Sequence, residues 1–137
     1  MQRRFGFLWI VGFLGVLAAA EAPAPASAQT QFDGTYRFVS STKVNQTYTT
    51  RQGQFGQCPD RNAGPLTIKQ GQAQYTSATG HRLRGTVGPQ GELTMRSVSA
   101  TISRPIELNA NGTVDGTGTV HARQIANSCS YDFVWQK

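Results

Sequence analysis

Residue types that carry catalysis and metal binding are scarce in this sequence. It has two histidines, two cysteines and seven acidic residues among 137 residues. It contains no H-E-x-x-H, no G-x-S-x-G and no phosphate-binding glycine loop, and its histidines and carboxylates are not clustered at metal-ligand spacing. We therefore expect a protein that is not an enzyme and that has no metal and no cofactor.

The sequence also lacks a hydrophobic run long enough to span a bilayer. The longest apolar stretch, residues 5–20, has 16 residues, whereas a transmembrane helix needs about 20. Arg3 and Arg4 precede this stretch, and "EAPAPASA" follows it with a small-residue cleavage site at residues 26–28. This order is typical of a signal peptide, and an uncleaved anchor is the alternative. We expect cleavage after Ala28, a periplasmic or secreted protein, and one domain over residues 29–137 without a stable membrane anchor.

The two cysteines, Cys58 and Cys129, stand far apart, and neither belongs to a C-x-x-C motif. This spacing disfavours a redox or metal role. Proteins exported to an oxidising compartment commonly form disulfides. We expect a Cys58–Cys129 disulfide across 71 positions of the chain. In the chain-entropy account, a loop of this length stabilises the fold by about 4 kcal/mol.

Runs of like charge are absent as well, although the chain is basic. Thirteen Lys and Arg against seven Asp and Glu give a net charge of +6, which becomes +5 when Arg3, Arg4 and Glu21 leave with the signal peptide. The basic residues are scattered, so we expect no nucleic-acid binding. The excess charge favours an anionic envelope component or a protein as the partner. A soluble surface that is basic without a charged partner is the alternative.

Beyond residue 30 the sequence has no helical periodicity and consists of short runs in which apolar and polar residues alternate. Such runs predict strands with one buried and one wet face, as in antiparallel sheets. Eight strands are expected, at 32–40, 66–70, 72–78, 82–88, 92–98, 105–110, 113–123 and 129–136. Eight strands can close a barrel that side chains fill. We therefore predict an all-β, eight-stranded antiparallel up-and-down barrel, with a β-sandwich as the alternative.

Glycine turns are expected to join pairs of these strands at one end of the barrel. They are "KQGQ", "GPQGE" and "NANGT", with their glycines at Gly71, Gly91 and Gly112. Gly116 and Gly118 are expected to face inward and to leave room for aromatic side chains. The interior is predicted to be a packed core rather than a ligand calyx, filled by Tyr36, Phe38, Leu66, Ile68, Tyr75, Leu83, Leu93, Met95, Ile106, Leu108, Val114, Val120, Tyr131, Phe133 and Trp135.

The longer connections are expected to meet at the opposite end. Residues 41–65 make a loop of 25 residues, and loops of that length are usually functional or disordered. In a closed meander, Cys129 begins the last strand close to the end of this loop, where Cys58 lies. Solvated loop charges on a stable barrel are the alternative to a functional surface. We predict a binding rim at this end, formed by Arg51, Phe55, Asp60, Arg61, His81, Arg82, Arg104 and Arg123, with Tyr48 and Asn127 beside them.

The export signal, "FDGTY", the mid-chain cysteine of "GQCPD", the glycine turns and the closing "SCSYDFVWQK" form a recognisable combination. It resembles small exported, uncharacterised β-proteins with a cysteine pair in Gram-negative alphaproteobacteria. The resemblance implies a periplasmic or secreted bacterial protein and carries over no catalytic residue. Together the features predict a non-enzymatic binding module that uses its long-loop end. An inhibitor of a protease or a lysozyme that acts through residues 41–65 is the alternative, and a small hydrolase is least favoured.

Overall fold

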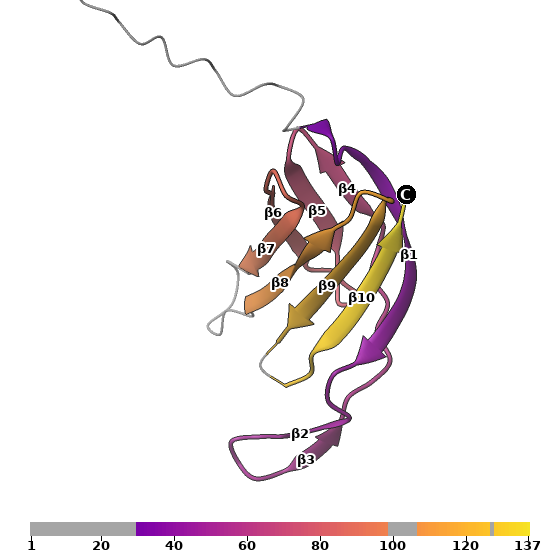
Figure 1. The fold of residues 1–137 in the computed structure, drawn as a ribbon. Coiled ribbons are helices and arrows are strands. Elements are labelled where there is room, and N and C mark those ends of the chain that lie inside the picture. The colour runs from indigo at the N-terminus through magenta and orange to yellow at the C-terminus, as the bar shows by residue number, and fades with distance from the viewer. Residues whose placement is uncertain (1–29, 99–106, 127) are drawn as a thin grey trace, which may run out of the picture.

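The computed structural model describes residues 30–98, 107–126 and 128–137, and the elements of these residues are all strands (Figure 1). No helix among them is long and apolar enough to cross a membrane. The strands are β1 (Gly34–Lys43), β2 (Thr47–Thr49), β3 (Phe55–Gln57), β4 (Leu66–Lys69), β5 (Gln72–Thr76), β6 (Arg82–Val87), β7 (Glu92–Val98), β8 (Glu107–Val114), β9 (Thr119–Ile125) and β10 (Tyr131–Gln136).

Eight of these strands close into one antiparallel barrel in the order β1-β10-β9-β8-β7-β6-β5-β4. Closure is made by β1, which pairs with β4 at its start and with β10 along the rest of its length. The register shifts between Phe38 and Ser40, which lie opposite Trp135 and Val134, so Val39 forms a bulge. Such a bulge bends one strand and helps it to follow the curve of a barrel. The predicted barrel is confirmed, and the sandwich is not formed.

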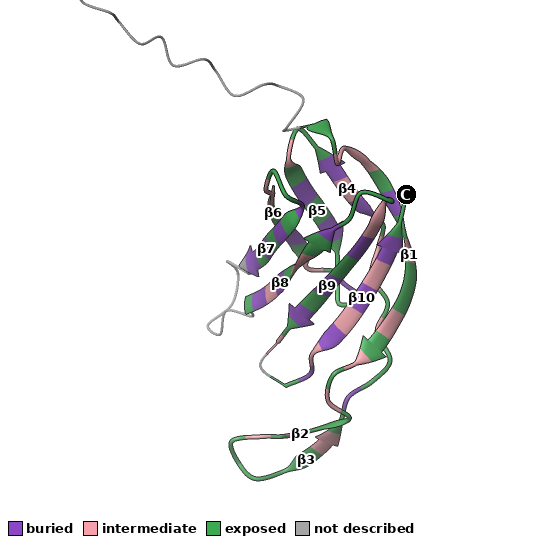
Figure 2. Cartoon of the chain, viewed as in Figure 1, coloured by how far each residue is buried: buried purple, intermediate pink, exposed green. Residues whose placement is uncertain are grey.

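Buried and exposed residues alternate along the barrel strands, as Figure 2 shows. On β10 the side chains of Tyr131, Phe133 and Trp135 are 3%, 1% and 0% exposed. The ring of Trp135 lies 5.1 Å from that of Tyr75 and 5.6 Å from that of Phe133, centroid to centroid. The predicted core residues are buried except for two: Phe38 is half-buried, and Ile106 lies outside the described residues.

The third hairpin turn does not lie at Gly112, as predicted, but at residues 115–118. Gly112 stands inside β8 opposite Ala122, and a Cβ there would collide with the backbone of β9. A glycine is therefore needed at this place for the close approach of two strands, not for a turn. The turn itself is organised by Asp115, whose Oδ1 accepts hydrogen bonds from the backbone amides of Thr117 and Thr119.

Two further predictions are wrong because the turn lies at residues 115–118. Gly116 and Gly118 belong to the turn and do not face the interior. The single strand predicted over 113–123 is instead the end of β8, the turn and most of β9. The inward positions on either side of the turn were nonetheless assigned correctly, because Val114 and Val120 are both buried.

The predicted disulfide is present. Cys58 and Cys129 are bonded, and their Cα atoms are 5.7 Å apart, which is the usual spacing for a disulfide. The bridge is consistent with an oxidising, exported location. It ties the segment before β4 to the segment before β10, at one end of the barrel.

Deleting residues 131–137 should abolish folding rather than shorten a strand. The deletion removes β10, which reopens the barrel and exposes the core around Tyr75, and removing one large buried aromatic alone costs about 3–5 kcal/mol. Far-UV circular dichroism and urea unfolding of the truncated protein would show this. Deletion of Lys137 alone is the control, because that residue is exposed. A truncated protein with a cooperative unfolding transition would contradict the prediction.

Candidate functional site

Connections of very different length lie at the two ends of the barrel. At one end residues 70–71, 88–91 and 115–118 make tight turns. At the other end residues 44–65, 77–81 and 126–130 join β1 to β4, β5 to β6 and β9 to β10, and we call this the long-loop end (Figure 1). Binding residues are most often carried by loops that a rigid scaffold positions. The long-loop end is therefore where a site is expected.

A small hairpin of residues 47–57 projects from the long-loop end (Figure 1). Tyr48 on β2 pairs with Gly56 on β3, and the phenol ring covers the glycine so closely that a Cβ there would collide with it. At the tip, the backbone amide of Thr50 donates to Gln54 O, and its hydroxyl accepts a hydrogen bond from the amide of Gln54. The segment that was predicted only as a long loop thus has a sheet of its own.

The base of the hairpin is fixed by covalent and polar contacts. The Cys58–Cys129 disulfide holds one side. On the other side, Asn45 Nδ2 donates to Ser128 O at 2.8 Å, and Asn45 Oδ1 accepts from the backbone amide of Ser130 at 2.9 Å. The backbone amide of Cys58 donates to Gln46 O. Both arms of the hairpin are therefore attached to the segment that leads into β10.

Three of the four exposed large hydrophobic residues of the described chain lie at the long-loop end. They are Val39, Val44, Phe55 and Ile125, and Phe55 on β3 is 84% exposed. All except Val39 lie at the long-loop end, at the base of the hairpin, on the hairpin or at the end of β9. Arg51 is exposed in the turn between β2 and β3. Exposed aromatic and arginine side chains are the residue types that contribute most to protein–protein contacts.

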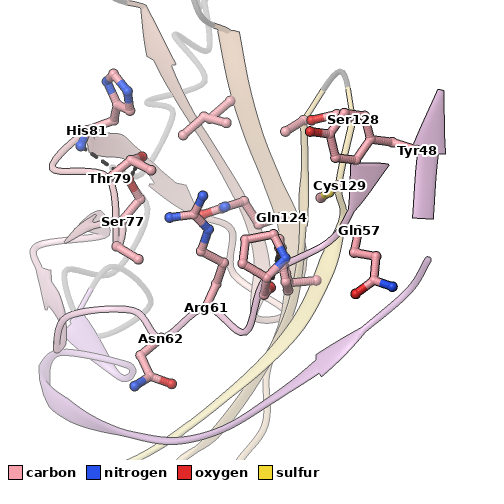
Figure 3. Close-up of a pocket in the computed structure, with 15 residues that line it drawn as sticks. Tyr48, Gln57, Arg61, Asn62, Ser77, Thr79, His81, Gln124, Ser128 and Cys129 are labelled. Atoms are coloured by element: carbon pink, nitrogen blue, oxygen red, sulfur yellow. Dashed lines mark hydrogen bonds between the residues drawn. The ribbon is translucent and has the colours of Figure 1, made fainter. Parts of the chain in front are cut away.

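A cavity of about 410 Å³ opens at the long-loop end, beside the hairpin (Figure 3). Tyr48, Arg61 and Leu108 line it, together with residues of the 77–81 loop. Gln124 also lines the cavity, and its Oε1 accepts a hydrogen bond from the phenol O–H of the buried Tyr75 at 2.6 Å. Burial raises the pKa of the Tyr75 phenol well above its ordinary value, so this hydroxyl stays protonated.

The 77–81 loop forms one edge of the cavity. The Ser77 hydroxyl is buried, lies 3.0 Å from Thr79 Oγ1 and accepts a hydrogen bond from the backbone amide of His81 at 3.1 Å. The imidazole of His81 points away from Arg61 in Figure 3. The loop thus contributes hydroxyl groups that are already engaged with each other, whereas Arg61 projects into the cavity.

A second hollow lies at the tight-turn end, between Phe32, Asp115 and Lys137. Its charged groups are occupied within the protein. Asp115 accepts hydrogen bonds from its own turn, which lowers its pKa, and Lys137 Nζ donates to Asp33 O. Because these groups already have partners, this hollow is a weaker candidate for a site than the cavity at the long-loop end.

The predicted rim residues do not form one surface. Arg61 and His81 are at the cavity, and Arg51 and Phe55 are on the hairpin. Asp60 pairs with Lys43 at 2.9 Å. Two further predicted residues lie on the outer wall of the barrel. Arg82 is near Arg84 and Arg96, and Arg123 makes two hydrogen bonds to the carboxylate of Asp132. Arg104 and Asn127 are outside the described residues.

Sequence reasoning missed the polar residues inside the mouth of the barrel. The buried polar side chains of the described chain are Ser77, Ser97 and Gln124, and each lies at or just beyond the end of its strand that faces the long-loop end. The signal was available: Gln124 follows Val120 and Ala122 at inward positions of an alternating strand. A polar residue at an inward position marks either a buried network or a ligand site.

No group of three or more His, Cys, Asp and Glu side chains that could hold a metal ion lies among the described residues. Comparison of the chain with family models, with curated proteins and with solved structures found no significant match. The candidate site is therefore defined by its own geometry.

The Tyr75 hydroxyl gives a test of the buried pair at high pH. The pKa of Tyr75 is raised by folding. The part of the unfolding free energy that depends on protonation of this phenol is therefore complete below the ordinary pKa of tyrosine and is lost as pH rises above that pKa. Between pH 9 and pH 11, the wild type should lose about 1.4 kcal/mol more unfolding free energy than Tyr75→Phe. Urea titrations of both proteins at each pH measure this, and equal losses would show that the phenol is not shielded.

Proposed function

We propose that this protein is a non-enzymatic binding module of the periplasm or the secreted fraction that docks on a protein partner through its 47–57 hairpin. The observation that carries the proposal is Phe55, whose ring is 84% exposed on a hairpin with a fixed base. Exposure of a large aromatic ring to water is unfavourable, and a partner that covered the ring would gain the free energy of removing its apolar surface from water. No comparable ring is exposed elsewhere in the described residues.

The way the hairpin is held supports this function. The disulfide and the Asn45 hydrogen bonds tie its base to residues 128–130, and Thr50 orders its tip. A segment that is ordered before binding loses less conformational entropy when it binds. The hairpin is thus a preorganised projection rather than a loop that must fold on its partner.

Charge favours an acidic surface on the partner. Arg51 lies in the turn of the hairpin, and the hairpin residues from Thr47 to Gln57 include no acidic side chain. Positive charge near an exposed aromatic speeds association with an anionic surface and contributes to specificity more than to affinity. The described residues thus pair an apolar anchor, Phe55, with a cationic neighbour.

Inhibition of a secreted or envelope enzyme is a second candidate function, and the shape of the hairpin favours it. A narrow, disulfide-anchored projection can enter a concave active site, whereas a flat barrel wall cannot. In that case the hairpin would contact the target by shape, and binding would persist in 0.5 M salt, where charge is screened beyond about 4 Å. An electrostatic contact would weaken under the same conditions.

The test compares Phe55→Ala with Val39→Ala, which removes another exposed hydrophobic side chain from the barrel wall. Each immobilised protein is exposed to a periplasmic extract, a specifically retained protein is identified and purified, and its Kd is measured by calorimetry. Phe55→Ala should weaken binding about 30-fold or more, as loss of an aromatic anchor does, and Val39→Ala should not. Equal affinity of Phe55→Ala and the wild type would overturn the hairpin as the docking element.

A further inference from the structure

We propose that the cavity at the long-loop end binds a small carboxylate attached to an apolar body. This ligand site goes beyond the docking function of the hairpin, and Phe55 is not among the residues that line it. The proposal rests on three features: a side-chain N–H group and a guanidinium that both lack a partner among the described residues, and apolar walls.

The first feature is the side-chain amide of Gln124. This residue is 6% exposed, and its Oε1 accepts the hydrogen bond of the Tyr75 hydroxyl at 2.6 Å. That bond fixes the orientation of the amide, so Nε2 is the end that remains to donate. No residue of the described chain accepts a hydrogen bond from Nε2, although Gln124 lines the cavity. No fully buried side-chain nitrogen or oxygen of the described residues lacks a partner, so Nε2 is open to the solvent of the cavity, where an acceptor on a ligand can replace water.

The second feature is the guanidinium of Arg61. The side chain is half-buried and projects into the cavity between the 77–81 loop and Gln124 (Figure 3). The ion pairs of the described residues involve Lys43, Arg96 and Arg123, and not Arg61. Among the lining residues none is an aspartate or a glutamate. A guanidinium in this position favours an anion, and its planar fork matches a carboxylate best.

The third feature is the apolar part of the lining, which selects the body of the ligand. Leu108, Tyr48 and Tyr131 contribute apolar surface, and the Tyr131 hydroxyl is already engaged, because it donates to Pro59 O at 2.7 Å. A volume of about 410 Å³ is in the range of small-molecule sites. A carboxylate with an aromatic or branched body would satisfy Arg61 and Gln124 at one end and cover apolar surface at the other. Inorganic phosphate would leave that apolar surface exposed to water.

Two sources can supply this chemistry: a free organic acid, or the C-terminal residue of a peptide. Cinnamate represents the first, and N-acetylphenylalanine represents the second. Their neutral amides, cinnamamide and N-acetylphenylalaninamide, have nearly the same shape without the charge. Titration of ¹⁵N-labelled protein with each compound gives Kd values, and the side-chain NH₂ signal of Gln124 reports the place of binding.

We expect at least one acid to bind, to shift the Gln124 signal, and to bind about tenfold or more tightly than its amide. The acid that binds identifies the source. Arg61→Gln should weaken that acid about tenfold or more, whereas Arg51→Gln, the same charge change on the exposed hairpin turn, should leave its affinity unchanged. Arg61→Lys keeps the positive charge but not the planar guanidinium, so its affinity for the acid should lie between that of Arg61→Gln and that of the wild type.

The proposal is overturned if neither acid binds more tightly than its amide, if phosphate binds as tightly as the better acid, or if Arg61→Gln binds that acid like the wild type. The Gln124 signal tests the site on the wild-type protein, so the result does not depend on the folding of a variant. Phe55→Ala should bind the acid normally. Loss of partner docking with retained acid binding, or the reverse, therefore separates this proposal from the function proposed for the hairpin.

Discussion

Strand β10 is the element on which both the barrel and its long-loop end depend. It lies between β1 and β9 and so closes the sheet. Three side chains of residues 129–135 also contact the long connection between β1 and β4. Cys129, two positions before β10, is bonded to Cys58. Tyr131 donates to Pro59 O, and Trp135 Nε1 donates to Gly64 O at 2.9 Å. Tyrosine and tryptophan can be buried in this way because each places its polar atom at a partner while its ring fills the core. The side chains that complete the core therefore also hold residues 58–64 in place.

This arrangement explains how a long connection can carry well-placed side chains. Arg61 lies between Pro59 and Gly64, the two residues whose carbonyl oxygens are held by β10, so its backbone is fixed on both sides. The hairpin of residues 47–57 precedes the disulfide and is attached through Asn45. Tyr48 belongs to the hairpin and also lines the cavity. The exposed ring of Phe55 and the cavity are thus neighbouring but separate surfaces, supported by one rigid base.

Much of the fold could be predicted because alternation is a strong signal when one face of every strand is buried. Tyr131, Phe133 and Trp135 identified β10 in this way, and the disulfide followed from the presence of two cysteines together with the expectation of export. The prediction of a turn at Gly112 was wrong, although an Asn-Gly pair such as Asn111–Gly112 is a local turn signal. The turn that forms is stabilised by the hydrogen bonds that Asp115 accepts from Thr117 and Thr119. Arg82 and Arg123 were assigned to the rim by their place along the chain, but both are at outward positions of strands and lie on the barrel wall.

The site was harder to predict because it depends on exceptions to alternation. Ser77, Ser97 and Gln124 occupy inward positions that an apolar residue would fill with less free-energy cost. All three lie at the long-loop end, while the inward residues at the other end include Tyr36, Leu93 and Val114. Among the described residues, the buried serine and glutamine side chains therefore all lie at the end with the long connections. Placing polar groups where a packed core would be more stable is typical of a site that recognises a ligand. Here Gln124 Nε2 and the guanidinium of Arg61 lie at the same cavity, and neither has a partner among the described residues.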